Sequence, residues 1–371
     1  MTSPQQPQGG SPHALTRREF FPKAAAVAVG AGAMLRAGSS VAAQPGSMKY
    51  RVLGQTGISL SEIGFGSHLD PANLADPAAR TKQIQRGLEL GINLFDIYDH
   101  SYHQFAPMST MLAPVRDRVV ISLVSVWPEN KTMAEIEHAL TVFGTDTVDL
   151  YRIYAGGDDE ASLERTEARL SDMQRAKDQG KIRAVGVSAH DQRAFIRLLQ
   201  SHPEVDYIMF PFNFRHRALK LTDAEVPDAG RNASDPAPDP GIRDCTSVPC
   251  PAPGFAAAVR DAGVGLIAMK PFAGGGLLRL AADDPRLQPL HEAGVRLPQA
   301  ALQFILQTPE IASTIPAMNS VSEVEQNVSA VFGGPLSDPQ GQFLDILNEA
   351  ADGTHGEYLP DSYRWLEDWR S

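Results

Sequence analysis

The sequence predicts an α/β protein that forms a (β/α)8 TIM barrel with an N-terminal β-hairpin and a C-terminal helical extension. Eight short, continuously apolar runs lie between residues 63 and 315, and longer amphipathic segments separate most of them. This alternation is typical of a parallel sheet that helices cover on both faces, and eight units match a closed barrel. The alternative is an open doubly wound sheet, which would place a GxGxxG turn after its first strand. The residues Ile63-Gly64-Phe65-Gly66-Ser67-His68 do not have that pattern.

The first 43 residues are expected to be a twin-arginine export signal rather than part of the barrel. Arg17 and Arg18 precede a mildly apolar run rich in Ala and Gly, residues 24–35, and Val41-Ala42-Ala43 offers a small-residue cleavage site. A bacterial signal peptide has these parts in this order; the alternative is a disordered tail that contains an Arg pair. The apolar run is too short for an ordinary transmembrane helix. We therefore expect recognition by the Tat export machinery, a periplasmic or otherwise exported protein, and no stable membrane span in its mature form.

The barrel is predicted over residues 49–335, and each of its elements follows from a local pattern. Residues 50–60 alternate around a Gln-Thr-Gly turn, which is typical of a β-hairpin. The predicted strands are 63–66, 92–95, 119–124, 147–154, 182–187, 207–212, 264–269 and 312–315. The predicted helices are 78–90, 133–143, 161–177, 192–199, 254–262, 298–306, 322–330 and 337–348. Gly91 ends the first helix and Gly180 the third, as expected of glycine at a helix C-terminus.

Two segments lie outside this repeating pattern. Residues 336–371 are predicted to be a helical extension, and its last aromatic stretch, 363–369, is expected to pack over the fold. Residues 214–253 form an insertion that is rich in Pro and Asp and carries the only two cysteines of the chain, Cys245 and Cys250. In an exported protein such a close pair favours a disulfide, and the start of a metal site is the alternative.

The composition restricts the class of partner. The chain has 371 residues, is 43% hydrophobic, and carries a net charge of −11 with no cluster of Lys and Arg. An acidic balance of this kind argues against nucleic-acid partners and against binding to anionic membrane surfaces.

Polar residues follow most of the predicted strands, and the function of a (β/α)8 barrel lies at the carboxyl ends of its strands. The residues delivered there, in strand order, are Ser67 and His68; Asp96 with the Tyr/His cluster after it; Val124 and Ser125; Tyr154; Ser188 to His190; Asn213; Lys270; and Met318 with Asn319. No carboxylate pair suits glycoside hydrolysis, and no spacing predicts a metal site. A metal held jointly by histidines of this rim stays open, the candidates being His68, His100, His103, His190 and His216. We expect a site for a small polar molecule.

Seven segments carry a resemblance to a known family. In order they are YRVLGQTGISLSEIGFGS, GINLFD, RDRVVIS, FGTDTVDLY, GKIRAVGVSAH, VGLIAMKPFAGG and IPAMNSVSEVEQNV. Over residues 49–331 the chain resembles the aldo/keto reductases. The resemblance implies a barrel fold, hydride transfer between NADPH and a small-molecule carbonyl or alcohol substrate, and no metal. Some of these segments resemble a bacterial subgroup that often has an iron–sulfur cysteine motif near the C-terminus, but no cysteine follows Asn348.

The family uses four catalytic groups, and two of them are replaced in this chain. Asp96 matches the family Asp. The family Tyr, which protonates the carbonyl oxygen, falls on Ser101, so Tyr102 is the candidate that a one-residue insertion would present. The family Lys, which lowers the pKa of that Tyr, falls on Val124, and the family His, which orients the substrate, falls on Tyr154. The resemblance therefore implies Asp96, Tyr102 and Tyr154 as the catalytic residues.

Loss of the family Lys has a physical consequence for Asp96. A buried carboxylate without a cation costs several kcal/mol, or else it takes up a proton. Either Asp96 has another partner or the pocket is wetter. A substitute cation from His100, Lys131 or Lys270 is conceivable.

The resemblance also implies NADP, or NAD, as the cofactor. Ser188 matches the Ser that binds the nicotinamide amide, and Met209 stands where the family has a Gln. The residues matching the pyrophosphate loop and the adenosine-phosphate end are Lys270, Pro271, Phe272, Gly275, Asn319, Glu323 and Asn327. Packing is the alternative role for Pro271 and Phe272, and a helix-surface position is the alternative for Asn327. No Arg or Lys for a 2′-phosphate occurs among residues 318–322.

Three functional hypotheses follow from the sequence. The first is an aldo/keto reductase-like oxidoreductase that acts on a carbonyl or alcohol. The second is a catalytically degenerate barrel that binds a small molecule or a protein outside the cytoplasm. The third is a histidine-lined rim that holds a metal for hydrolytic or isomerase chemistry.

Overall fold

The computed structural model describes residues 47–67, 76–98, 102–155, 160–190, 192–217 and 253–369. The expected export signal, most of the Pro/Asp-rich insertion with both cysteines, His68 and His100 lie outside the described residues. Within the described ranges, no helix is both long and apolar enough to span a bilayer.

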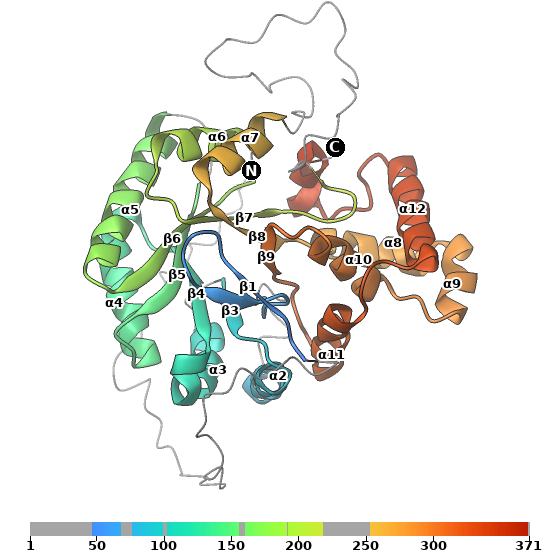
Figure 1. Ribbon diagram of the computed structural model, residues 1–371, viewed down its shortest axis with the longest axis horizontal. Coiled ribbons are helices and arrows are strands. Elements are labelled where there is room, and N and C mark those ends of the chain that lie inside the picture. Colours follow the sequence, from blue (N-terminus) through green and yellow to red (C-terminus); the bar gives the residue numbers. More distant parts are fainter. Residues whose placement is uncertain are drawn as a thin grey trace, which may run out of the picture. The chain divides into compact units, whose positions relative to one another are not determined.

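Seven parallel strands form one sheet in which every strand pairs with its neighbour in sequence (Figure 1). The strands are β3 (Leu94–Ile97), β4 (Val120–Val124), β5 (Val148–Tyr154), β6 (Ile182–Ser188), β7 (Tyr207–Pro211), β8 (Gly265–Met269) and β9 (Ile311–Thr314). All of them are almost fully buried, as expected of strands covered on both faces.

The segment 63–66 occupies the eighth strand position and closes the sheet. Phe65 bridges to Phe95 of β3, and Ile63 bridges to Thr314 of β9, so the segment contacts both edge strands. A Cβ on Gly66 would lie 2.5 Å from the carbonyl oxygen of Pro316. Only glycine permits that close approach of two backbones, and the predicted barrel fold is confirmed.

A β-hairpin covers the amino end of the barrel. Strands β1 (Tyr50–Val52) and β2 (Ser59–Ser61) pair antiparallel, as predicted. Leu53, Ile58 and Leu60 belong to the apolar cluster that fills the barrel interior. The hairpin therefore closes the end opposite to the strand carboxyl termini.

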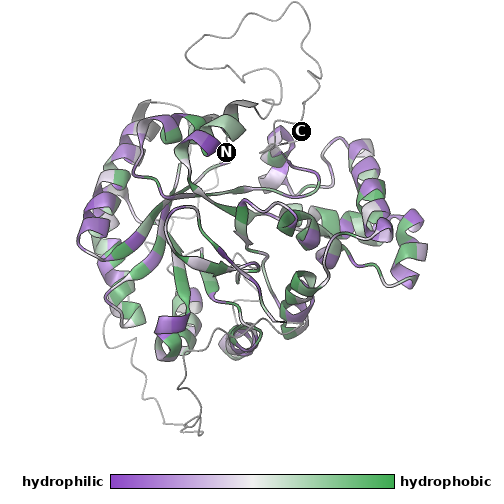
Figure 2. Cartoon of the chain, viewed as in Figure 1, coloured by the Kyte–Doolittle hydropathy of each residue, from purple (hydrophilic) through white to green (hydrophobic). Residues whose placement is uncertain are grey.

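Amphipathic helices surround the sheet and present their apolar sides to it (Figure 2). The helices that alternate with strands are α2 (Pro77–Glu89), α4 (Thr132–Phe143), α5 (Glu160–Asp178), α6 (Gln192–Ser201), α7 (Pro253–Ala262), α10 (Leu297–Leu306) and α11 (Val321–Ser329). All of them lie where the sequence pattern predicted a helix. Their ends carry recognisable signals, such as the Asp76 side chain that caps α2 and the left-handed Gly144 that ends α4.

Two helical regions were missed from the sequence. Residues 102–112 form α3 (Tyr102–Leu112), followed by the 3-10 turn η1 (Ala113–Arg118). Its internal Pro107 and aromatic start hide the helical pattern, although Phe105, Met108 and Leu112 are fully buried on one face. The stretch after β8, where no helix was predicted before residue 298, contains η3 (Ala273–Gly275), α8 (Gly276–Asp283), η4 (Pro285–Leu287) and α9 (Gln288–Glu292).

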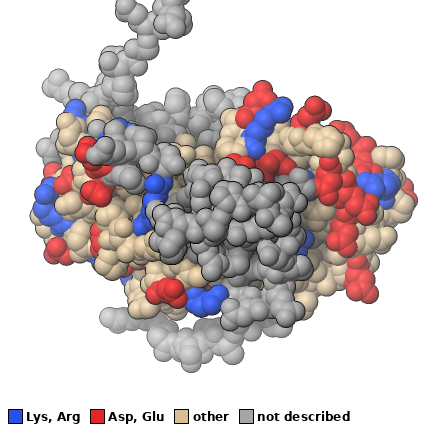
Figure 3. All heavy atoms as spheres, turned by 90° about the horizontal axis from the view of Figure 1, so that it is seen from above, with Lys and Arg blue, Asp and Glu red and all other residues tan. Residues whose placement is uncertain are grey.

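The C-terminal extension packs beside and across the barrel. After η5 (Ala330–Phe332), α12 (Asp338–Gly353) buries Phe343, Leu344 and Leu347 in a cluster shared with α8 and α10. The 3-10 helix η6 (Asp361–Trp369) follows, and its last residue, Trp369, is fully buried. Acidic side chains gather on the α12 side of the face drawn in Figure 3, which makes that surface repulsive to polyanions.

Candidate functional site

Inward-facing positions on β3, β4 and β5 change from apolar to polar toward the carboxyl ends of the strands. The inward-facing residues nearer the amino ends of these strands belong to the interior apolar cluster. They are Leu94, Val120 and Leu150. Because side chains alternate along a strand, the next inward positions lie two residues further on. They are Asp96, Ser122 and Arg152, and β5 then ends at Tyr154, which is 43% exposed. The barrel is thus apolar at its base, charged above, and accessible to solvent at Tyr154.

Asp96 and Arg152 form a buried ion pair. Nη1 of Arg152 lies 2.5 Å from Oδ1 of Asp96 and Nη2 lies 3.1 Å from Oδ2, so both ends of the guanidinium bind the carboxylate. The Ser122 hydroxyl donates to Oδ1 at 2.7 Å and accepts from Nη1 at 3.1 Å. The charged side chains are only 3% and 4% exposed. Bidentate geometry with a further hydrogen bond is what a buried ion pair needs to offset its desolvation.

Arg152 supplies the cation that the resemblance places at Val124. Val124 is the register partner of Arg152 in the β4–β5 ladder, so the guanidinium enters from the neighbouring strand. Sequence reasoning missed this residue. The available signal was a single arginine in the apolar run 148–154, because a charge inside a buried strand requires a partner.

The three substitute cations considered from the sequence do not pair with Asp96 in the described part of the chain. Lys131 ends the short turn η2 (Glu129–Lys131) and is exposed. Lys270 makes no ion pair with any described carboxylate. His100 lies outside the described residues.

The Tyr207 ring closes the polar layer from the side of β7. Its register partner is Gly186 of β6, where a Cβ would come within 2.1–2.6 Å of three ring atoms, so only glycine leaves room for the ring. The hydroxyl is buried and lies close to the Ser122 side chain. Burial raises the pKa of Tyr207, while the nearby Arg152 charge acts in the opposite direction. This phenol is therefore held neutral.

Tyr154 and His190 meet at the mouth of the barrel. The Tyr154 hydroxyl lies 3.1 Å from Nδ1 of His190, and their rings contact edge to face at 4.9 Å between centroids. The His190 ring also stacks on Trp365 of η6, at 3.6 Å and 14°. Burial, and then the charge of Lys270, lower the pKa of His190 to about 4. The imidazole is consequently neutral at neutral pH.

Lys270 follows β8 with a left-handed backbone, at φ 60°. Such a conformation costs a non-glycine residue of order 1–3 kcal/mol and persists where surrounding structure enforces it. Nζ of Lys270 lies 3.4 Å from the Tyr363 hydroxyl and 4.7 Å from the centre of its ring. Burial, followed by the charge of Arg152, lowers the pKa of Lys270 to about 8. The site therefore has a cation that no described carboxylate neutralises by direct contact.

Glu135 of α4 holds the loop after β4 in place. Its carboxylate accepts from the Ser125 hydroxyl at 2.6 Å, from the backbone N–H groups of Val126 and Trp127 at 2.8 and 2.9 Å, and from the Tyr151 hydroxyl at 2.7 Å. Ser125, which the sequence placed at the rim, is thus engaged in this support.

Tyr102, predicted from the resemblance as the proton donor, is the first residue of α3. Its side chain lies outside the described part of the structure, so its role stays a prediction.

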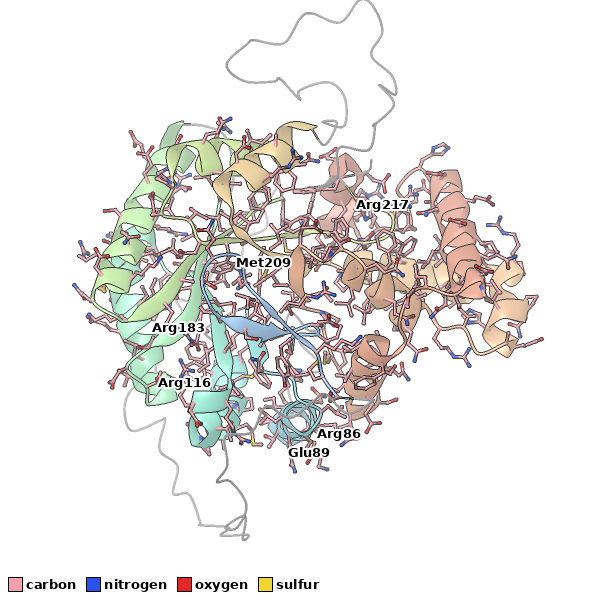
Figure 4. The ribbon with its side chains drawn as sticks, in the orientation of Figure 1. Arg86, Glu89, Arg116, Arg183, Met209 and Arg217 are labelled. Atoms are coloured by element: carbon pink, nitrogen blue, oxygen red, sulfur yellow. The ribbon has the colours of Figure 1, made fainter. Side chains whose placement is uncertain are left out.

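The residues assigned to the nicotinamide amide are largely engaged by the barrel. The Ser188 hydroxyl donates to the carbonyl of Ile153 at 3.2 Å, and Ser188 is 5% exposed. Met209 belongs to the interior cluster and lies in the centre of the barrel (Figure 4). Ser188 is therefore positioned at the carboxyl end of β6, but its partner on β7 is the apolar Met209.

The loop assigned to the pyrophosphate has features of an anion site and is partly covered. Gly275, at φ 86°, is the N-cap of α8 and provides no side-chain cap, and the N–H groups at a helix N-terminus favour anions. Pro271 is buried and Phe272 packs on the C-terminal cluster, so both also have a packing role. The Tyr363 ring lies against Gly274, where a Cβ would be 2.7 Å from it.

The residues assigned to the adenosine-phosphate end complete the N-terminus of α11. The Glu323 carboxylate accepts from the backbone N–H of Asn319 at 2.8 Å, and the Ser320 hydroxyl accepts from the N–H of Glu323 at 3.1 Å. Asn327 is only 3% exposed, so it is not a helix-surface residue. The Arg80 guanidinium donates to the carbonyl of Met318 at 2.9 Å.

Histidines of the rim serve packing and hydrogen bonding where the structure describes them. His216 is fully buried, with Nδ1 3.1 Å from Oδ1 of Asn213 and Nε2 3.2 Å from the Tyr358 hydroxyl. The described residues contain no group of three His, Cys, Asp or Glu side chains that could hold a metal ion. His190 instead stacks between aromatic rings.

Comparisons with known proteins point to one fold. No family model matches the chain. L-galactose dehydrogenase of Arabidopsis thaliana is 24% identical over 319 residues, which are 76% of this chain and 88% of that enzyme. The aldo-keto reductase AKR11C1 of Bacillus halodurans is 21% identical in its holo form, with a TM-score of 0.58 over 85% of this chain and 99% of its own. A Pseudomonas aeruginosa protein described as an aldo-keto reductase is 17% identical, with a TM-score of 0.54 over 76% of this chain and 94% of its own.

These likenesses agree with the barrel described above. The chain has the fold of the aldo-keto reductases.

Proposed function

We propose that the protein is an aldo/keto reductase-type oxidoreductase that interconverts a carbonyl compound and an alcohol. The observation that carries this proposal is the bidentate Asp96–Arg152 pair in the barrel interior, with Tyr154 two residues beyond Arg152 on the same face of β5. The resemblance implies a buried pair of an Asp and a Lys. In this chain the cation is Arg152 on β5 instead of a lysine at position 124 on β4.

The proposed substrate is a small polyhydroxylated molecule. Two tyrosines at the strand ends are well exposed, Tyr98 at 45% and Tyr154 at 43%, and each offers a hydroxyl and an aromatic face. Such side chains bind hydroxyl groups and the apolar faces between them. The relative from Arabidopsis thaliana is named for its action on L-galactose, a sugar, which agrees with this chemistry.

The proposed cofactor is a nicotinamide dinucleotide, which when bound would supply or accept the hydride. Lys270 and the uncapped N-terminus of α8 at Gly275 offer positive potential for its pyrophosphate. Ser188, at the carboxyl end of β6, would contact its amide. Since residues 318–322 contain no Arg or Lys, and a 2′-phosphate needs such a cation, we expect NAD to bind more tightly than NADP. Asn319 and Glu323 would border the adenosine, from the cap of α11.

The chain's own residues have defined roles in this proposal. Asp96 and Arg152 form a rigid, fully paired charge layer that holds the base of the site dry and ordered. Lys270 provides the positive charge that contacts the pyrophosphate. Tyr102, which the resemblance implies, and Tyr154 are the two proposed proton donors.

The proposed activity is tested by hydride transfer measured directly. The full chain is incubated with NADH deuterated at C4 and with 4-nitrobenzaldehyde, and in the reverse direction with NAD and L-galactose. We expect deuterium on the carbinol carbon of the reduced aldehyde, and loss of at least 90% of the rate in Arg152→Leu, since the base of the site would then carry an unpaired carboxylate. The matched control is Arg183→Leu, on the outside of the barrel (Figure 4). Product without deuterium, or equal rates in both variants, would contradict the proposal.

A specific contact favours a second candidate, a barrel that binds a ligand without transferring hydride. The Tyr363 ring lies against Gly274, and Trp365 stacks on His190. Both belong to η6, which therefore lies on the loop that the first candidate assigns to the pyrophosphate. Binding of a sugar without binding of either dinucleotide would favour this second candidate.

We also propose export through the twin-arginine pathway, on the strength of the Arg17-Arg18 motif and the apolar run after it. Replacement of both arginines by lysine is expected to retain the protein in the cytoplasm of a bacterial host, with uncleaved residues 1–43. Unchanged periplasmic recovery of that variant would refute this part.

A further inference from the structure

Tyr154 and His190 form a pair whose mutual orientation is fixed. The hydroxyl of Tyr154 and Nδ1 of His190 are 3.1 Å apart, within hydrogen-bond distance. Tyr154 is the last residue of β5 and pairs in register with Ser188, so His190 follows two residues after its ladder partner. Neighbouring strand ends therefore deliver the two groups to the same point of the mouth.

The C-terminal segment holds His190 from two further directions. Trp365 stacks on the imidazole with ring centres 3.6 Å apart. The indole N–H of Trp369 donates to the backbone carbonyl of His190 at 2.8 Å, and the Trp369 ring is fully buried. Since the ring plane and the backbone are both fixed, Nδ1 of His190 stays directed at Tyr154.

The charges around this pair favour a phenolate on Tyr154. Among the described residues, the titratable groups that face His190 are Tyr154 on β5 and Lys270 after β8, while η6 contributes the uncharged rings of Trp365 and Trp369. Burial together with the Lys270 ammonium keeps the imidazole neutral, with a pKa of about 4. A neutral imidazole with its proton on Nδ1 donates to the phenol oxygen. A hydrogen bond to the charged form and a nearby cation both favour ionisation of a phenol.

We propose that Tyr154 is the proton donor of the reaction and that His190 is its positioning residue, with the Nδ1–H group of His190 donating to the Tyr154 oxygen. The proposal rests on the oxidoreductase function proposed above. During reduction the Tyr154 O–H bond breaks and its proton forms the new O–H bond of the alcohol, while the carbonyl carbon gains hydride from the reduced dinucleotide. The Tyr154 phenolate, stabilised by His190 and Lys270, then regains a proton from solvent. Oxidation of an alcohol runs through the same groups in reverse.

This assignment moves the proton donor from the loop after β3, where the resemblance placed it at Tyr102, to the end of β5. The cation has moved to the same strand, since Arg152 and Tyr154 are two residues apart and both face inward. The Lys and Tyr that the family resemblance implies are thus replaced by Tyr154 on β5, His190 after β6 and Lys270 after β8.

The acidity of Tyr154 can be measured without substrate or cofactor. The full chain is labelled with 13C at Cζ of its eight tyrosines, and each resonance is followed by NMR against pH; the resonance absent in Tyr154→Phe is Tyr154. Burial raises the pKa of five of the others, Tyr50, Tyr151, Tyr207, Tyr358 and Tyr363, which keeps them from titrating early. We expect Tyr154 to titrate below pH 10, and about one pH unit higher in His190→Phe, which keeps the stack on Trp365 but lacks Nδ1.

A conservative variant separates positioning from packing. His190→Asn places an amide N–H near the position of Nδ1, and it is expected to restore part of the low titration midpoint that His190→Phe loses. An unchanged Tyr154 midpoint in both variants would overturn the inference. So would a midpoint above 10 in the native chain, because that would mean that the Tyr154 hydroxyl donates to His190 and is the weaker acid.

Kinetics distinguishes this inference from the proposed function itself. With 4-nitrobenzaldehyde and NADH, Tyr154→Phe should lower kcat by about 10²-fold or more, and His190→Phe should lower kcat about tenfold with KM little changed and the alkaline limit of the rate moved upward. Loss of activity in Tyr102→Phe with full activity in Tyr154→Phe would overturn the assignment. If no variant and no native protein reduces the aldehyde, the oxidoreductase proposal fails, and the NMR titration still decides whether His190 acidifies Tyr154.

Discussion

Replacement of Arg152 by leucine would leave the Asp96 carboxylate in the barrel interior without its cation. The side chains are 3% and 4% exposed, so water cannot take the place of the guanidinium. Two charged hydrogen bonds, at 2.5 and 3.1 Å, would be lost, and the Ser122 hydroxyl at 2.7 Å would be the remaining donor. Breaking a buried ion pair in this way costs about 3–5 kcal/mol.

The magnitude converts into an observable change in thermal unfolding. For a domain of this size, each kcal/mol lowers the Tm by about 2 °C, so Arg152→Leu should melt about 6–10 °C below the native protein. The double variant Asp96→Leu/Arg152→Leu removes both charges, and replacement of a buried pair by apolar groups is often neutral. It should therefore recover most of the loss, giving a coupling free energy of about 2–4 kcal/mol in the double-mutant cycle.

A half-exposed ion pair provides the matched control. Arg183 binds Asp149 at 2.8 Å with a side chain that is 48% exposed. Asp149 is 3% exposed but also binds Arg116 at 2.8 Å, so Arg183→Leu leaves it paired and should cost less than about 1 kcal/mol. Additive effects of the two interior substitutions, or an Arg152→Leu protein as stable as Arg183→Leu, would refute the buried pair as the organising feature of the site.

Three further predictions concern the packing around the site. The pKa of His190 is about 4 in the folded protein and 6.5 for an ordinary histidine, so the unfolded chain binds more protons between those values. The free energy of unfolding should therefore rise from pH 4 to pH 6.5. Denaturant titrations of His190→Phe should show a smaller rise, whereas identical slopes for both proteins would contradict the burial of this ring. Gly186→Ala forces a methyl against the Tyr207 ring and should lower the free energy of unfolding by about 1–3 kcal/mol. Its control, Gly341→Ala in α12, has nothing within 4 Å of the new methyl and should stabilise the protein by up to about 1 kcal/mol. Equal effects of the two variants in chemical denaturation would contradict the close contact. Trp369→Ala empties a fully buried site among three phenylalanines and should cost about 3–5 kcal/mol, with a wild-type melting curve as the contradicting result.

The fold was largely predictable from the sequence because the barrel strands are short, continuously apolar and regularly spaced. Hydrophobic periodicity and helix-ending residues determine such elements locally. The left-handed Gly144 at the end of α4 is an example. The helix α3 escaped because Pro107 and a polar, aromatic first turn mask a buried face that only tertiary packing reveals. The turns and short helices after β8 escaped for a similar reason, since they are stabilised by the C-terminal extension.

The site was less predictable, because its partnerships cross between strands. Asp96 was identified as an acid that needs a cation, but the choice of Arg152 depends on ladder register, which places it beside Val124. The pairing of His190 with Tyr154 likewise depends on β5–β6 register, and its support by Trp365 joins residues 175 positions apart in sequence, 190 and 365. No local pattern encodes such contacts.

Binding of the dinucleotide tests the central claim most directly. The full chain is titrated with NADH and with NADPH by calorimetry, alongside Lys270→Met and the exposed control Lys131→Met. The account predicts that NADH binds more tightly than NADPH, and that Lys270→Met weakens NADH binding about tenfold through loss of a charge–phosphate contact, while Lys131→Met does not. Absence of heat with either dinucleotide at millimolar concentration would contradict the oxidoreductase account and leave a barrel closed by its own C-terminal segment.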